Sequence, residues 1–178
     1  MGGSAQVQRR IVRVGGLTRS ELASALAAAG VRLNASAEVL LADPLFAGAD
    51  AEIPASVEVV ECTVGQLGLD DGATLPQILA AGQEQGLAPC APFTGPYLRL
   101  ARPDQPSAPD SLMSAGRPPL GALHVASERL RVEDDYPRGF YLRVVEGTLW
   151  LRGFRCSDDA PWSTGDRFAF RATTAARG

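Results

Sequence analysis

Residues 57–87 constrain the fold of this chain more than any other segment, because a strand pattern leads through a turn into a helix pattern. Residues 57–64 are rich in β-branched side chains and apolar on both alternating faces, which is typical of a strand covered on both sides. Thr74 is a suitable N-cap, Pro76 is tolerated in a first helical turn, and Gly86 can end a helix. The segment therefore predicts a strand, a turn and a capped helix.

The residues before this segment predict a short strand and two helices. The strand is expected over residues 10–14. Thr18 and Glu21 have the spacing of a capping box, in which each side chain satisfies a free amide of the first turn, and Gly30 can end that helix. A second helix is expected after Asn34, which is another suitable N-cap.

Pairs of short helices also occur in DNA-binding modules, so DNA binding is a possible function of this unit. The second helix contains Glu38 and ends near Asp43, and it carries no basic residue. A recognition helix normally carries donors for phosphates and base edges. The sequence therefore favours packing or protein contact over DNA binding.

The domain organisation follows from a change in composition. Residues 46–56 are small and acidic and include one proline, which is typical of a linker. We therefore expect a small helical N-terminal unit over residues 1–50 and an α+β main domain over residues 51–178. A chain of 178 residues is long enough for one domain with such an appendage.

The second half of the chain is dominated by strand patterns. Residues 97–100 are expected to form a short strand with Arg99 pointing outward. Residues 140–154 alternate around Glu146-Gly147, which predicts a hairpin with a two-residue turn. The fold class expected is α+β, with helices mainly in the N-terminal half and a predominantly antiparallel sheet in the C-terminal half. A long loop with five prolines is expected over residues 101–119.

Composition limits the cellular setting and the partners. The net charge is -3 and every basic residue is an arginine, so bulk electrostatics gives no reason to expect nucleic-acid or anionic-membrane binding. No stretch approaches the roughly 20 apolar residues of a membrane span. The three cysteines are widely spaced and form no Cys-x-x-Cys pair, which favours reduced thiols in a cytoplasmic protein.

Candidate catalytic residues are few. Asp70, Asp71, Arg99 and His124 could form a carboxylate and arginine pocket between the sheet and a helix over residues 75–85. His124 is the single histidine, so any imidazole chemistry would need it. The simpler interpretations are that the aspartates belong to a turn and that the histidine is packed.

Metal and cofactor sites are not expected. Cys62, Cys90 and Cys156 could bind zinc with His124 only if the fold brought them together, because they lack the close pairs of structural zinc sites. Cys90 is the best candidate for a reactive thiol, although a small buried side chain is the stronger interpretation. The glycines that follow the 57–64 strand lack the order of a phosphate-binding loop, so they are assigned to turns.

Aromatic and arginine residues alternate near the C-terminus, and two interpretations remain open. Such a mixture could stack the bases of a single-stranded nucleic acid. The favoured alternative is an aromatic core face and an outer face covered by arginine stems. The residues are Tyr136, Phe140, Tyr141, Trp150, Phe154, Trp162, Phe168 and Phe170 with Arg138, Arg143, Arg152, Arg155 and Arg167.

Several short motifs recur in an order that resembles a family of small bacterial proteins of unassigned function. They lie at residues 61–68, 71–74, 85–90, 95–100, 104–106, 149–151 and 167–168, and include a Gly-Ala-Thr helix start and a Gly-Pro-x-Leu-Arg-Leu strand. The resemblance covers about residues 57–171, and residues 107–139 depart from it. It implies a bacterial origin and a shared fold, and it supplies no activity.

Three functional hypotheses follow. The first is a non-enzymatic interaction protein that contacts a protein partner or a second copy through the arginine and aromatic face or the 101–119 loop. The second is a small-ligand-binding protein or a hydrolase-type enzyme with the carboxylate and arginine pocket. The third is a single-stranded nucleic-acid accessory factor, which the net charge makes the least expected of the three.

Overall fold

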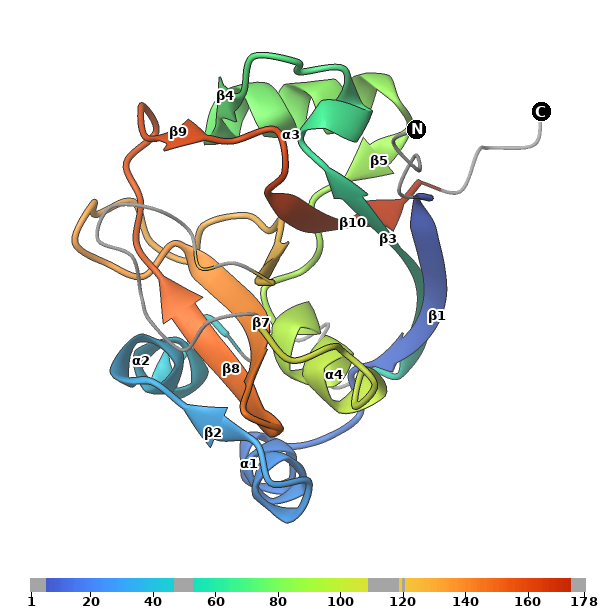
Figure 1. Cartoon of the computed structure of the whole chain (residues 1–178). Helices are drawn as coiled ribbons and strands as arrows, with labels where there is room; N and C mark the ends of the chain where they lie inside the picture. Colours follow the sequence, from blue (N-terminus) through green and yellow to red (C-terminus); the bar gives the residue numbers. More distant parts are fainter. Residues whose placement is uncertain (1–5, 47–52, 109–118, 120, 174–178) are drawn as a thin grey trace.

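The computed structural model describes residues 6–46, 53–108, 119 and 121–173, and has an α+β fold (Figure 1). Its helices are α1 (Arg19–Ala28), α2 (Ala35–Ala42), η2 (Gly65–Leu67, a 3-10 turn), α3 (Leu75–Glu84) and α4 (Thr94–Ala101). Its strands are β1 (Gln8–Val14), β2 (Arg32–Leu33), β3 (Ala55–Thr63), β4 (Ala73–Thr74), β5 (Leu87–Ala88), β6 (Leu123–Val125), β7 (Gly139–Val145), β8 (Thr148–Phe154), β9 (Pro161–Trp162) and β10 (Arg167–Ala172).

The main sheet has the strand order β1-β3-β10-β6-β7-β8-β2, and β5 also pairs with β10. Its pairs are antiparallel except β10 with β6 and β2 with β8, which are parallel. Figure 1 shows the sheet curving around α4, with β1 on one side and β8 on the other. Strands β4 and β9 form a separate small sheet near α3.

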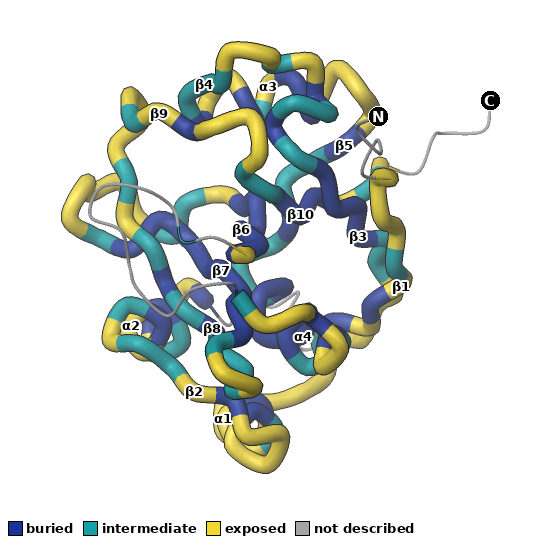
Figure 2. The backbone as a smooth tube through the Cα atoms, in the orientation of Figure 1, coloured by how far each residue is buried: buried dark blue, intermediate teal, exposed yellow. Residues whose placement is uncertain are grey.

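Each face of the sheet carries its own hydrophobic core. The face toward α4 contributes Val59 and Leu142, which are fully buried together with Leu98 of the helix. The opposite face contributes Val60 and Phe168, which belong to the cluster that packs under α3. Figure 2 shows the same concentration of buried residues in α4 and in the central strands. The prediction that the 57–64 strand is covered on both sides is therefore confirmed.

The local signals of the N-terminal region are also confirmed. Thr18 and Glu21 form the capping box of α1, with hydrogen bonds of 3.1 Å and 2.8 Å to each other's backbone amides. Gly30 has a φ of 73°, which favours glycine after a helix. Asn34 caps α2 through a 2.9 Å hydrogen bond from the amide of Ala37.

The described residues of both expected units, 1–50 and 51–178, contribute to one sheet and to the hydrophobic cluster around α4. Strand β1 pairs with β3, and β2 pairs with β8, so both early strands are completed by the later part of the chain. Leu22 of α1 and Leu40 of α2 belong to the same buried cluster as Leu98 of α4. Residues 47–52, which include most of the expected linker, lie outside the described residues.

The prediction of a strand over residues 97–100 was wrong. These residues belong to helix α4, and Arg99 is fully buried rather than directed outward. An alternation over four residues is too short to separate a period of 2 from a helical period, and Pro96 is acceptable because it lies in the first turn. Since α4 is enclosed by the curved sheet and α1, all of residues 94–99 are buried, so the helix buries more than one face.

The hairpin predicted over residues 140–154 is confirmed. Strands β7 and β8 form the expected hairpin, in which Glu146 and Gly147 have φ values of 50° and 78°. Both central residues of a type I′ turn need positive φ, as found here. Of the expected 101–119 loop, residues 109–118 lie outside the described residues. Within the described part of the chain, no helix is long and apolar enough to cross a membrane.

Candidate functional site

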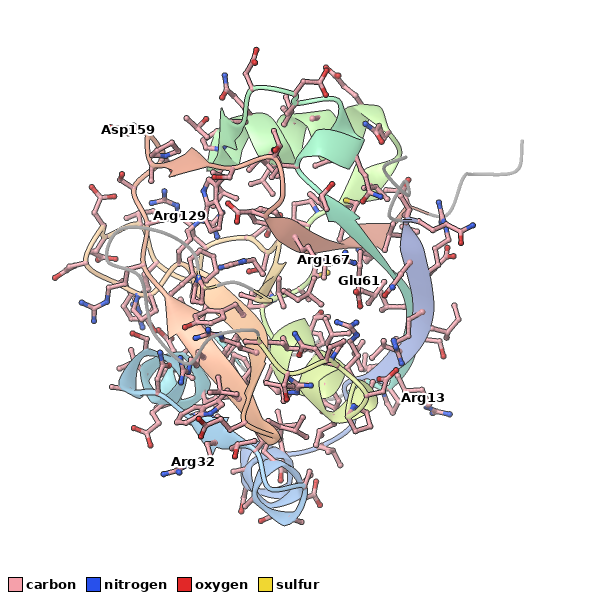
Figure 3. All side chains as sticks on the ribbon, viewed as in Figure 1. Arg13, Arg32, Glu61, Arg129, Asp159 and Arg167 are labelled. Carbon is pink, nitrogen blue, oxygen red and sulfur yellow. The ribbon has the colours of Figure 1, made fainter. Side chains whose placement is uncertain are left out.

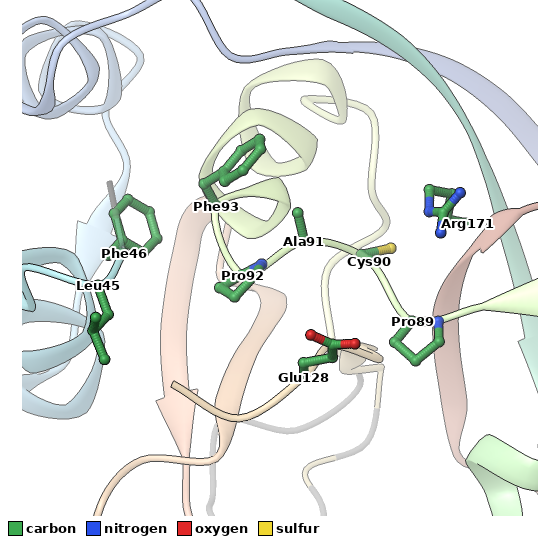
Figure 4. A pocket seen from close by; sticks show the side chains of 9 residues that line it. All are labelled: Leu45, Phe46, Pro89, Cys90, Ala91, Pro92, Phe93, Glu128 and Arg171. Atoms are coloured by element: carbon green, nitrogen blue, oxygen red, sulfur yellow. The ribbon is translucent and has the colours of Figure 1, made fainter. Parts of the chain in front are cut away.

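A cavity of about 340 Å³ opens between the end of α2, the segment joining β5 to α4, the loop after β6, and β10 (Figure 4). Seven of its nine lining residues have apolar side chains, although polar atoms make up most of the exposed lining surface, and two lining residues carry opposite charges. The lining residues are Leu45, Phe46, Pro89, Cys90, Ala91, Pro92, Phe93, Glu128 and Arg171.

The segment between β5 and α4 forms a firm wall of this cavity. Pro89 and Pro92 restrict its backbone, because the proline ring holds φ near about -65°. The amide of Cys90 donates to the carbonyl of Ala126 at 2.6 Å, which attaches the segment to the end of β6. The segment then enters α4 through a turn, in which the amide of Thr94 donates to the carbonyl of Ala91 at 3.0 Å. The wall is thus held at both ends by backbone hydrogen bonds.

Glu128 and Arg171 are the charged residues of the lining. Both are exposed, and neither forms an ion pair or a side-chain hydrogen bond within the described part of the chain. Figure 4 shows Cys90 between the carboxylate of Glu128 and the guanidinium of Arg171. The cavity therefore offers an acidic group and a basic group that do not neutralise each other.

Cys90 contributes to the cavity as a packed side chain. It is 1% exposed, and its Sγ lies 3.8 Å from the carbonyl oxygen of Ala169. Burial raises the pKa of the Cys90 thiol to about 12, so the thiol is protonated at neutral pH. Since the thiolate is the nucleophile, Cys90 is not activated for covalent chemistry. Burial likewise raises the pKa of Cys62 to about 11 and raises that of Cys156.

His124 lies away from the cavity lining, within an aromatic cluster. Its ring stacks on Tyr141 with a centroid distance of 5.2 Å and meets Trp162 edge-on at 4.7 Å. Phe154 and Phe168 complete the surroundings at 5.1 Å and 5.6 Å. Burial lowers the pKa of His124 to about 3, and a hydrogen bond with the backbone of Arg167 opposes this shift only in part. The imidazole is therefore neutral at pH 7, and it is 2% exposed.

The structure does not bring the sequence-predicted site residues together. Arg99 points from α4 toward the β7–β8 hairpin, where it donates to Gln105 Oε1 at 2.7 Å and to the carbonyl of Trp150 at 3.3 Å. Asp70 and Asp71 are exposed in the turn after η2. Since His124 is enclosed by aromatic rings, the candidates occupy three separate places. Across the described ranges, no group of three His, Cys, Asp or Glu residues is placed to hold a metal ion.

A buried ion-pair cluster at the end of α4 was missed by the sequence analysis. Glu61 of β3 is 1% exposed; its Oε1 lies 3.1 Å from Arg102 Nε and its Oε2 lies 3.6 Å from Arg167 Nη2 (Figure 3). Arg10 of β1 donates to the carbonyl of Ala101, the last residue of α4, at 3.1 Å. Arginine side chains at a helix C-terminus interact favourably with its unpaired carbonyls. This cluster connects α4 with three strands.

The predicted arginine cover over aromatic residues is present at Trp150 of β8. The guanidinium carbon of Arg152 lies 4.2 Å from the Trp150 ring centre, and that of Arg32 lies 5.3 Å away. Arg143, which was expected on the outer face, is fully buried instead. Its position shows that arginine in this chain does not always indicate a surface residue.

The sequence pointed to one residue of the cavity, Cys90 between two prolines, and missed its charged residues. Glu128 and Arg171 lie in different segments, and no local pattern marks them as neighbours. Comparison of the chain with family models, with curated proteins and with solved structures found no match.

Proposed function

We propose that this protein is a non-enzymatic binding protein that holds a small ligand in the cavity between α2 and β10. The observation that carries the proposal is a cavity lined mainly by apolar side chains, together with one carboxylate and one guanidinium that have no ion-pair partner among the described residues. Its volume of about 340 Å³ is at the lower end of the roughly 300–1,000 Å³ range of small-molecule sites. Apolar walls with a few polar groups are typical of such sites.

A hydrolase-type activity is less well supported at this cavity. Nucleophilic catalysis needs an activated group, and the Cys90 thiol is protonated and buried. Acid–base catalysis by a pair of carboxylates needs a second acid near Glu128, and none lines the cavity. Binding without chemistry is therefore the function that these residues support best.

The test is a small-molecule screen by protein-detected NMR with a variant that fills the cavity. Ala91→Trp places an indole in the lining, whereas the matched control Ala80→Trp places one on the exposed side of α3. We expect compounds that shift the resonances of Phe93 and Arg171 to bind the wild type and Ala80→Trp and to lose binding in Ala91→Trp. If Ala91→Trp binds the same compounds with unchanged affinity, the cavity is not the site.

A second candidate function is contact with a protein partner or a second copy, and Trp150 favours it. This tryptophan is partly exposed between two arginines, and tryptophan and arginine dominate the energetics of many protein interfaces. Sedimentation velocity over a range of concentrations would test self-association, with Trp150→Ala expected to reduce it. A monodisperse monomer together with no partner recovered from the native lysate would remove this support.

We place this binding function in the bacterial cytoplasm. Three free cysteines support a reducing compartment, and the exclusive use of arginine with abundant alanine, glycine and proline supports a GC-rich bacterial genome. The net charge of -3 supports partners other than nucleic acids. Fractionation of the native host checks the compartment, and recovery of the protein outside the cytoplasmic fraction would contradict it.

A further inference from the structure

We infer that the ligand of this cavity is a small zwitterion with an apolar body, whose carboxylate pairs with Arg171 and whose ammonium group pairs with Glu128. This inference rests on the proposed binding function and specifies its ligand class. Its starting point is that two opposite charges line the same small volume and form no ion pair with any residue that the structure describes.

Some charged residues of this protein form ion pairs, whereas Glu128 and Arg171 form none within the described residues. Arg9 pairs with Glu58 at 3.3 Å, and Arg131 pairs with Asp43 at 2.6 Å. Arg171 has no such partner in the described residues, and its positive charge only partly opposes the rise that burial causes in the pKa of the Cys90 thiol. A ligand that carries both charges would supply a counter-charge to each residue at once.

The apolar part of the lining sets the character of the ligand body. Pro92 and Phe93 present ring surfaces to the cavity, and the ring of Phe93 is held edge-on to Tyr97 at a centroid distance of 6.5 Å. Leu45 is 56% exposed at the border of the cavity. A ligand with an aromatic or branched aliphatic group would cover these surfaces, and their removal from water would make binding more favourable.

Other ligand classes fit these residues less well. A nucleotide or another polyanion would meet one guanidinium and would be repelled by Glu128. An uncharged apolar compound would remove both charged groups from water without a partner, which is costly. A cation alone would pair with Glu128 but would be repelled by the positive charge of Arg171. A zwitterion is the class that leaves neither charge without a counter-charge.

The test uses probes that share one body and differ in charge. Phenylalanine and the dipeptide alanyl-phenylalanine cover two charge separations, and each is prepared free, N-acetylated, C-amidated and doubly blocked. We expect at least one free zwitterion to bind roughly tenfold more tightly than its singly blocked forms, measured by protein-detected NMR titration. Equal binding of the doubly blocked form would overturn the zwitterion assignment and leave the cavity as a binding site.

If none of these probes binds at millimolar concentration, the zwitterion assignment is overturned too. The screen with Ala91→Trp then decides separately whether the cavity binds other small molecules. The two failures are therefore distinguishable.

Charge variants assign each end of the ligand. Glu128→Gln should lower the affinity for the free probe roughly tenfold and leave the affinity for the N-acetylated probe unchanged. Arg171→Gln should leave the affinity for the C-amidated probe unchanged. The double variant Glu128→Arg with Arg171→Glu should restore binding of the free probe in the reverse orientation. The matched controls Glu133→Gln and Arg155→Gln change exposed residues outside the lining and should bind like the wild type. An equal loss of affinity for the free probe in the two control variants would contradict the assignment.

Discussion

The side-chain amide of Asn34 forms two hydrogen bonds with the backbone of Gly153, a residue of β8 far along the chain. The amide of Gly153 donates to Asn34 Oδ1 at 2.9 Å, and Asn34 Nδ2 donates to the carbonyl of Gly153 at 3.1 Å. The same Oδ1 caps α2 by accepting from the amide of Ala37. A Cβ atom at position 153 would lie 2.7 Å from the backbone carbon of Ser36, so the close approach requires glycine. One side chain thus both starts a helix and attaches it to the sheet.

Variants at Asn34 should separate the two roles of this side chain. Asn34→Ala removes the cap and both bonds to β8, and we expect it to lower the free energy of unfolding by about 2 to 3 kcal/mol. Asn34→Ser keeps a capping oxygen but cannot reproduce the paired amide contacts, so its loss should be smaller. Urea unfolding followed by tryptophan fluorescence measures both. Equal losses would indicate that the contact with Gly153 contributes little.

Replacement of Arg99 should destabilise the protein because its guanidinium is fully buried. Arg99→Met leaves Gln105 Oε1 and backbone carbonyls of the hairpin without their donor, so we expect a loss of about 2 to 4 kcal/mol. Arg99→Lys keeps one donor group and should fall between this variant and the wild type. The control Arg155→Met changes an exposed residue and should shift stability by less than about 0.5 kcal/mol. A similar effect of both methionine variants would contradict the role of Arg99.

His124 should make the stability of the protein depend on pH in mildly acidic solution. Its pKa is about 3 in the folded protein against 6.5 for a free histidine, so the unfolded chain binds a proton first as pH falls. The contribution is fully present above pH 6.5 and is lost between that value and about 3, with a slope of up to about 1.4 kcal/mol per pH unit. His124→Phe should reduce this slope between pH 6.5 and 4.5. Because the chain has one histidine, NMR titration of its Hε1 proton gives the folded pKa directly. A midpoint near 6.5 would contradict the prediction.

The cysteines should be slow to react with thiol reagents in the folded protein. Cys62 and Cys90 are buried with raised pKa values of about 11 and 12, so we expect no labelling of either until the chain unfolds. Cys156 is partly exposed and should react first, although its raised pKa makes it slower than a free thiol. Labelling with Ellman's reagent at pH 8, followed by peptide mass spectrometry, gives the order. Labelling of Cys90 at the rate of a free thiol would show that the cavity wall opens.

Local patterns were enough to predict elements whose signals lie within a few residues of each other. The capping box of Thr18 and Glu21, the helix that ends before Gly86 and the Glu146-Gly147 hairpin all depend on short-range backbone geometry. Helix α4 was not predictable from an alternation of four residues, because its environment decides which faces are buried. Asn34 was predictable as a cap and not as a partner of Gly153.

The amino-acid sequence by itself determined the α+β class, the caps and turns, and the absence of close metal-ligand pairs, because each of these is a property of neighbouring residues. Only the tertiary structure decided that Cys90 and His124 are buried and that Arg99 is enclosed. It also decided that Glu128 and Arg171 line one cavity. Burial and convergence of side chains arise from contacts between distant segments, and these depend on how the sheet curves around α4 (Figure 1).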